Sequence, residues 1–176
     1  MKQHPLHQFK FCPVCGQPTF IIHNEKAKEC THCGFVYYFN PSSAVACFIR
    51  NEAGELLLVR RAKDPGKGTL DLPGGFVDMY ESAEEAAARE VEEETGLQID
   101  HCEYLFSIPN IYPYKGFEVH TVDMFSSVMS SNLPRHRQPT MQPKSSFVAS
   151  HATTRRIRSY FHPESYPAIS GNEPLK

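Results

Sequence analysis

The sequence predicts an α/β domain that is preceded by a small metal-stabilised module. Two observations support this prediction. Four cysteines stand in two Cys-x-x-Cys pairs near the start of the chain, a pattern typical of a metal site. One well-capped helix lies between segments whose apolar residues are spaced as in β-strands.

Length and composition limit the class of protein. The 176 residues are enough for one ordinary domain and a small accessory one, and 40% hydrophobic with 22% charged residues indicates a globular fold. No apolar run approaches the ~20 residues of a membrane span, and Met1–Cys12 lacks a signal-peptide core. We therefore expect a cytoplasmic protein with reduced thiols and no membrane partner.

The two cysteine pairs are the first element. Cys12 and Cys15 form one knuckle, and Cys30 and Cys33 form the second, with 14 residues between the two. Four thiolates at this spacing suit a closed tetrahedral Zn²⁺ site and resemble a zinc ribbon over residues 1–41. The alternatives are two disulfides or redox motifs, and the lack of a secretory signal favours zinc.

Several short apolar segments read as strands. Residues 44–50 and 55–61 are predicted to form a hairpin around an Asn51–Gly54 turn, and residues 98–108 and 117–125 form two later strands. Arg60 and Arg61 end the second strand, where they either face solvent or contact a phosphate. We favour the phosphate contact for one of the two arginines.

A single helix follows the glycine-rich turn Pro73–Gly75. Ser82 and Glu85 have the spacing of a capping box, and Gly96 provides a left-handed stop. Glu90, Glu93 and Glu94 fall at i, i+3 and i+4 of this helix, so they share one face. Like charges at this spacing repel, and a hard cation such as Mg²⁺ removes the repulsion. The alternative is an acidic, solvated helix face.

The stretch from residue 75 to 97 resembles the Nudix box in every fixed position, which are Gly75, Glu81, Arg89, Glu90, Val91, Glu93, Glu94, Gly96 and Leu97. The resemblance implies a Nudix-type α/β/α sandwich with a mixed sheet, its core over residues 42–125. It implies Mg²⁺, or Mn²⁺ in its place, held by Glu90, Glu93 and Glu94 with the Gly75 carbonyl as a further ligand. It also implies that Arg89 pairs with Glu81, and we favour Glu93 or Glu90 as general base.

The implied reaction is hydrolysis of the pyrophosphate bond in a nucleoside diphosphate linked to another moiety, such as ADP-ribose, a nucleotide sugar, a dinucleotide or a damaged nucleotide. The preceding ribbon resembles NADH pyrophosphatases, but their Ser-Gln-Pro-Trp-Pro-Phe-Pro motif needs a tryptophan, which this chain lacks. NADH specificity therefore does not carry over. The rival hypotheses are a non-catalytic module that senses nucleotides or binds nucleic acid, and an enzyme disabled by its C-terminal sequence.

Charge is unevenly distributed along the chain. Residues 1–41 carry a net +2, residues 42–125 carry −9 and residues 126–176 carry +5. The acidic middle argues against direct contact with a bare polyanion such as a nucleic acid, unless cations mediate it. A small nucleotide as partner is what the resemblance to the Nudix box implies. A homodimer is left open.

The composition and the apolar periodicity of the sequence change after Phe125. The segment 126–176 holds two acidic residues and ten serines, and it lacks an extended amphipathic pattern. It reads either as a disordered tail or as the product of a shifted reading frame near residue 126. Translation of the coding DNA in the other two frames tests the second hypothesis.

Overall fold

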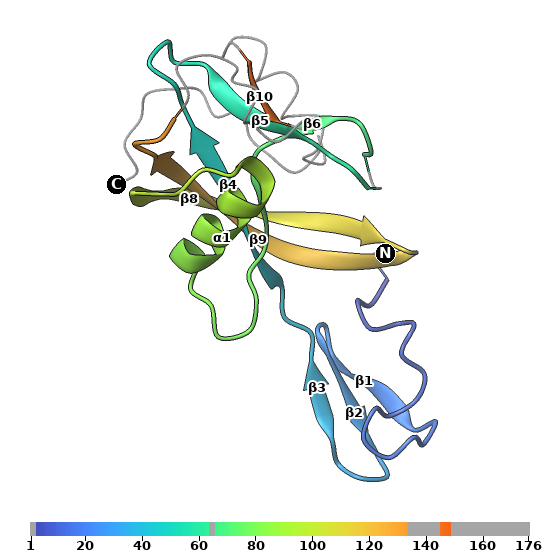
Figure 1. Ribbon diagram of the computed structural model, residues 1–176. Coiled ribbons are helices and arrows are strands. Elements are labelled where there is room, and N and C mark those ends of the chain that lie inside the picture. The colour runs from blue at the N-terminus through green and yellow to red at the C-terminus, as the bar shows by residue number, and fades with distance from the viewer. Residues whose placement is uncertain (1–2, 64–65, 134–144, 149–176) are drawn as a thin grey trace, which may run out of the picture.

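The computed structural model describes residues 3–63, 66–133 and 145–148. The N-terminal module is a three-stranded antiparallel sheet in the order β1-β2-β3 (Figure 1). Its strands are β1 (Phe20–Asn24), β2 (Ala27–Cys30) and β3 (Val36–Tyr38). The core of this module is small, since Phe20 and Phe35 stack beside the buried Cys12 and Cys30. So small a core needs a metal or another cross-link to be stable.

The larger domain is built on a mixed four-stranded sheet in the order β7-β4-β9-β8. β4 and β9 run parallel at its centre, and the outer strands pair antiparallel to them. Its strands are β4 (Ser42–Ile49), β7 (Gly74–Phe76), β8 (His101–Tyr114) and β9 (Phe117–Met129). A second sheet has the order β10-β5-β6 and contains β5 (Leu56–Arg60), β6 (Leu70–Asp71) and β10 (Ser145–Val148).

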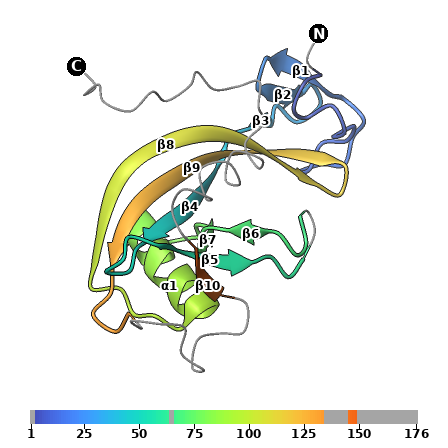
Figure 2. The same cartoon turned by 90° about the horizontal axis from the view of Figure 1, so that it is seen from above.

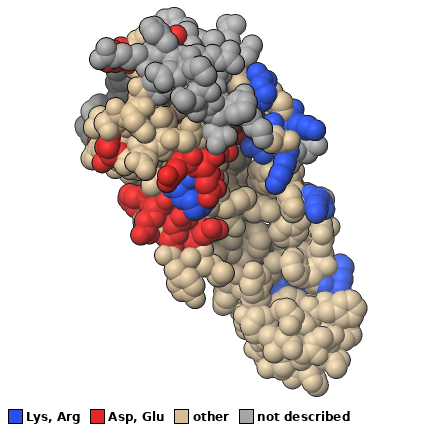
Figure 3. Space-filling view, in the orientation of Figure 1, with Lys and Arg blue, Asp and Glu red and all other residues tan. Residues whose placement is uncertain are grey.

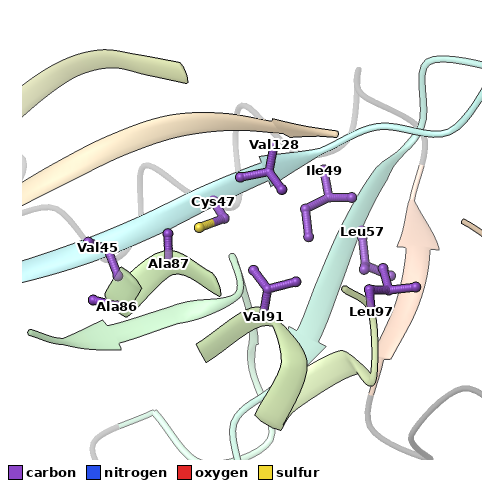
Figure 4. Close-up of a cluster of buried hydrophobic side chains, with 9 residues drawn as sticks. All are labelled: Val45, Cys47, Ile49, Leu57, Ala86, Ala87, Val91, Leu97 and Val128. Atoms are coloured by element: carbon purple, nitrogen blue, oxygen red, sulfur yellow. The ribbon is translucent and has the colours of Figure 1, made fainter. Parts of the chain in front are cut away.

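The described helix, α1 (Ala83–Thr95), covers one face of the four-stranded sheet (Figure 2). Alternate residues of β4 point toward it, so Val45, Cys47 and Ile49 meet Val91 in a buried cluster (Figure 4). The opposite face of β4 packs on a second cluster that includes Leu58, Leu72 and Phe125. Burial raises the pKa of the Cys47 thiol to about 12, as suits a core side chain. The predicted α/β class with a mixed sheet is confirmed.

The predicted hairpin of residues 44–50 and 55–61 is wrong beyond its base. Only the bridge between Arg50 and Leu56 links the two segments, and β5 then joins the second sheet. The cause is that both sides of β4 are already paired, with β7 on one side and with β9 on the other. β5 is also buried on both faces, since Leu57 packs in the cluster beside α1 and Leu58 packs in the other cluster.

The last two predicted strands are longer than expected. β8 begins at His101 and continues to Tyr114, and β9 runs past residue 125 to Met129, with Val128 in the core. The hypotheses about the tail stay predictions, because most of residues 126–176 lie outside the described residues. Within the described part of the chain, no helix is both long and apolar enough to cross a membrane.

Candidate active site and metal centre

The local sequence fixes both ends of the site helix. Ser82 Oγ accepts the Glu85 N–H at 3.2 Å, and Glu85 Oε2 accepts the Ser82 N–H at 2.7 Å. At the other end Gly96 has a φ of 74°, and its N–H donates to the Glu92 carbonyl at 2.8 Å. The predicted capping box and left-handed stop are therefore confirmed. These caps set the start and phase of the helix, and so which face carries the glutamates.

Two adjacent glycines bring β7 close to its neighbours. Gly74 has a φ of 153°, and a Cβ there would lie 2.1 Å from the carbonyl oxygen of Val45 in β4. A Cβ at Gly75 would lie 2.4 Å from Oε1 of Glu90. A side chain at Gly74 is thus excluded because it would collide with the backbone of β4, and one at Gly75 because it would collide with a carboxylate of the site.

Arg89 joins the loop before the helix to the helix itself. Its Nε and Nη2 donate to the two carboxylate oxygens of Glu81 at 2.8 and 3.0 Å, and Nη2 also donates to the Phe76 carbonyl at 3.1 Å. Its Nη1 donates to Glu90 Oε1 at 2.8 Å. The Glu81 hydrogen bonds are the largest cause of the raised pKa of Arg89. Figure 3 shows basic side-chain atoms within a patch of acidic side chains over α1.

The three helix glutamates have different surroundings. The Glu94 carboxylate accepts the Gly74 N–H at 3.1 Å and is half-buried. Burial, helped by the charge of Glu90, raises the pKa of Glu94 to about 7. The side chain of Glu90 is 15% exposed and that of Glu93 is 62% exposed. One face of α1 therefore holds a half-buried carboxylate at Glu94, one paired with Arg89 at Glu90, and an exposed one at Glu93.

The predicted arginines line a small cavity together with two of these glutamates, Glu93 and Glu94. The cavity has a volume of about 210 Å³, and its lining includes Arg60, Arg61, Asp71, Gly74, Glu93 and Glu94. Arg61 Nη1 donates to Asp71 Oδ2 at 3.0 Å, and its Nη2 donates to the Tyr112 hydroxyl at 3.2 Å. Arg60 is exposed and its Nη1 donates to the Gly68 carbonyl. Arg61 is therefore the more firmly oriented of the two.

Two neighbours of this cavity were not anticipated in these roles. Asp71 orients Arg61, yet nothing in its sequence context marks it, because the contact joins two strands. Tyr112 accepts a hydrogen bond from Arg61, while its ring meets Phe76 edge-on at 6.0 Å. Farther along the same face of β8, Asn110 Nδ2 donates to Asp123 Oδ2 at 2.8 Å.

The four predicted cysteine ligands converge in the N-terminal module. Their sulfur atoms all lie within 4.8 Å of one another, with 3.7 Å between Cys12 and Cys33 and 3.6 Å between Cys15 and Cys30. Sulfurs on a tetrahedral zinc ion lie about 3.8 Å apart, given a Zn–S bond of about 2.3 Å. The Thr19 hydroxyl, 3.5 Å away, lowers the pKa of Cys30 to about 6 and so favours the thiolate that binds metal. All four cysteines are free thiols, so the disulfide alternative is wrong for this structure.

Fold and site together define a two-module protein, a four-cysteine metal ribbon followed by an α/β domain with an acidic helix. A family model described as "NUDIX domain" matches residues 40–164, and one described as "NADH pyrophosphatase zinc ribbon domain" matches residues 7–38. The first covers more than half of the chain, which therefore belongs to the Nudix family. The N-terminal module is a zinc ribbon.

Curated relatives match part of this chain. The chain is 39% identical over 114 residues to the NAD-capped RNA hydrolase NudC of Haemophilus influenzae strain PittGG, across 62% of this chain and 42% of that protein. It is 28% identical over 140 residues to the protein of the same name from Vibrio atlanticus strain LGP32, across 80% of this chain and 47% of that one. The chain thus spans less than half the length of these relatives.

Solved structures share the fold. A MutT NUDIX hydrolase from Burkholderia pseudomallei is 27% identical with a TM-score of 0.52, over 68% of this chain and 98% of that one. A NUDIX hydrolase from Nitrosomonas europaea has a TM-score of 0.54 at 23% identity, over 81% of this chain and 78% of that one, which bears on the fold alone.

Proposed function

We propose that this chain is a pyrophosphohydrolase that depends on Mg²⁺, or on Mn²⁺ in its place. Its substrate would be a nucleoside diphosphate linked to another moiety. The observation that carries the proposal is that Glu93 and Glu94 line the same small cavity as Arg60 and Arg61. A diphosphate needs cationic groups around its oxygens and a positioned water, and this cavity is lined by both arginines and carboxylates.

The carboxylates suit a hard divalent cation. We assign Glu90, Glu93 and Glu94 as its ligands, with the Gly75 carbonyl as a further one. The charge of Glu90 helps to raise the pKa of Glu94, so the two groups are close enough to repel, and a cation between them would relieve that repulsion. The chemistry that such an ion supplies is neutralisation of phosphate oxygens and activation of water.

The protein side chains have separate proposed roles. Arg61 binds a phosphate oxygen, because Asp71 and Tyr112 hold its guanidinium at the cavity wall. Arg60 adds charge at the rim. Arg89 and Glu81 brace the loop against the helix. Of the two candidates for general base we assign Glu93, because its side chain is 62% exposed and its carboxylate lies 3.8 Å from Arg89 Nη1, whereas Glu90 is hydrogen-bonded to the same nitrogen at 2.8 Å.

Two further assignments belong to this proposal. A small nucleotide is the principal partner, and a reducing compartment such as the cytoplasm suits an N-terminal site of free thiols. The names of the curated relatives add NAD-capped RNA to the substrates worth testing. The identity of the second moiety is a matter for measurement, since the tryptophan of the NADH pyrophosphatase motif is missing.

The first experiment is release of mononucleotide from ADP-ribose, NADH, oxidised dGTP and an NAD-capped RNA, with Mg²⁺ and with EDTA. We expect turnover of at least one substrate with Mg²⁺ only. Glu94→Gln should lower kcat by at least about 100-fold, because a metal ligand should cost no less than the 10–100-fold typical of its supporting groups. Its unfolding free energy should change by less than about 0.5 kcal/mol, since the substitution also removes a repelling charge.

The matched control is Glu103→Gln, which changes an exposed carboxylate on β8 and should leave turnover intact. Full activity in Glu94→Gln would overturn the metal assignment. Silence of the folded wild-type protein across the panel, together with nucleotide binding in calorimetry, would favour the non-catalytic sensing module.

A further inference from the structure

The end of the β8–β9 hairpin is an arm without a third described strand. β4 pairs with β9 only from Thr121 onward, whereas β8 and β9 stay paired out to Tyr114 and Phe117. Among the described strands, residues 111–114 and 117–120 therefore pair only with each other. A two-stranded hairpin by itself is marginally stable in water, so the arm needs support from elsewhere.

The N-terminal module supplies that support. Phe9 and Phe39 both meet the ring of Phe117 edge-on, with centroids 5.9 and 6.1 Å away. Phe39 also meets the ring of His120 at 5.5 Å, and Gln8 Nε2 donates to the Gly116 carbonyl at 2.7 Å. Figure 2 shows the far end of the hairpin beside this module. The arm is thus held near its turn by residues on both flanks of the ribbon.

The supporting aromatics are tied to the metal-binding strand. The Phe39 N–H donates to the Lys26 carbonyl at 2.7 Å, and the buried Lys28 donates its ammonium to the Phe9 carbonyl. β2 carries Lys28 and ends at Cys30, one of the four clustered thiols. Because the core of the ribbon is small, metal binding would order β2 and with it Phe9 and Phe39.

The arm in turn carries a residue of the candidate site. Tyr112 pairs with Val119, which lies between the two residues that Phe39 contacts. The Tyr112 hydroxyl accepts the hydrogen bond from Arg61, and its ring meets Phe76. A shift of the arm would therefore move a group that orients Arg61 at the cavity.

We propose that Phe39 is a positioning residue, which holds the β8–β9 arm on the zinc ribbon and thereby keeps Tyr112 against Arg61. The ribbon then sets the affinity for substrate, while the glutamates of α1 set the chemical step. The expected change in KM rests on the proposed function, whereas the expected loosening of the arm rests on the fold alone.

The test compares Phe39→Ala with Phe11→Ala in the full chain. Phe11 is an aromatic residue of the same module that is 62% exposed, so it is a matched control. In Phe39→Ala we expect amides 111–120 to exchange hydrogen at least about fivefold faster, with α1 amides unchanged and zinc retained. Removal of zinc from the wild type should speed the same amides. In Phe39→Ala the KM should rise about three- to tenfold while kcat stays within twofold of the wild type. This is the result expected when a variant loses a contact that stabilises the bound substrate and the transition state equally. Phe11→Ala should match the wild type in every measurement.

Unchanged exchange in the arm of Phe39→Ala would overturn the proposal, and so would a fall in kcat without a change in KM. Should Phe39→Ala fail to fold, Phe39→Leu keeps most of the volume without the ring and must still loosen the arm. The exchange measurement needs no turnover. An inactive wild type with a loosened arm in the variant would therefore contradict the proposed function while leaving the support of the arm established.

Discussion

Arg89 forms hydrogen bonds with two parts of the site, the loop before the helix and a glutamate of the helix itself. Its guanidinium binds Glu81 and the Phe76 carbonyl in the preceding loop, and it also binds Glu90 on its own helix. A planar cation with a fork of donors can satisfy these acceptors together, and a lysine cannot. The residue thus fixes the loop and orients one proposed metal ligand at the same time.

The two glycines of the turn give a matched pair of predictions at the scale of single residues. Gly74→Ala should destabilise the protein by about 2–3 kcal/mol, because its Cβ would meet the backbone carbonyl of Val45 at a strained φ. Gly75→Ala should cost much less stability, since its Cβ meets the movable carboxylate of Glu90, but it should abolish most turnover. Denaturant unfolding and kcat of both variants check this.

A different result would separate the causes. If Gly75→Ala unfolded as readily as Gly74→Ala, then the close approach at position 75 would be a backbone requirement rather than one of the site. If it kept full activity, the placement of Glu90 beside Gly75 would not matter for turnover.

Some residues of the site carried signals in the sequence and others did not. Glu90, Glu93 and Glu94 stand at helical spacing, so geometry places them on one face, whereas the pairing of Arg89 with Glu81 was implied by the resemblance to the Nudix box. Asp71 and Tyr112 meet Arg61 only through pairing between distant segments, 51 residues apart for Tyr112. No local pattern encodes such a contact, which is why neither was assigned a role in orienting Arg61.

At the scale of elements, α1 was predictable because its limits are set by neighbours in sequence: Ser82 and Glu85 at one end and Gly96 at the other. β5 was misplaced because periodicity shows that a segment is a strand but not which strand it pairs with. Its run of buried leucines indicates that both faces of the strand are covered, but not which strands lie beside it.

The brace between helix and loop makes a prediction about pH. The Arg89 hydrogen bonds lower the pKa of Glu81 below its ordinary value. A carboxyl group with a lowered pKa in the folded state stabilises that state above its unfolded pKa of about 4.3, and the contribution is lost as pH falls through the folded pKa. Glu81→Gln should therefore lower the unfolding free energy at pH 7, and the deficit should shrink below about pH 4.

This deficit is measured by urea unfolding of the wild type and of Glu81→Gln from about pH 3 to about pH 8. Glu92→Gln is the control, because Glu92 is an exposed carboxylate of the same helix, and its effect should be small at every pH. A deficit in Glu81→Gln that stayed constant across the range would mean that the ionised pair with Arg89 is not its source.

At the scale of the whole molecule, two modules with unequal cores share one chain. The zinc ribbon rests on a few buried residues and four thiols, whereas the Nudix domain has apolar clusters on both faces of β4. The fold class of the ribbon was predicted from cysteine spacing, and the fold class of the larger domain was predicted from one motif. Neither pattern predicted that the ribbon packs on the β8–β9 arm, because aromatic contacts between modules produce no periodic pattern in the sequence.

Zinc removal should therefore affect the modules unequally. Cys30→Ser should lose stoichiometric zinc and protection of ribbon amides, because a four-thiolate site with one ligand missing cannot close around the ion. Cys102→Ser changes a free cysteine outside the cluster and should keep its zinc. Elemental analysis together with hydrogen exchange provides the check. An unchanged zinc content in Cys30→Ser would contradict the assignment of the ligands.

The parallel pairing of β4 with β9 also bears on the order in which the chain folds during synthesis. Partners such as Ser42 and Thr121 are separated by roughly eighty residues, so the central pair of the sheet cannot form until nearly all of β9 has left the ribosome. The ribbon needs only contacts between near neighbours. On the nascent chain the metal site would close first, and the apolar face of β4 would wait for its partner. This interval is when the protein is most exposed to aggregation.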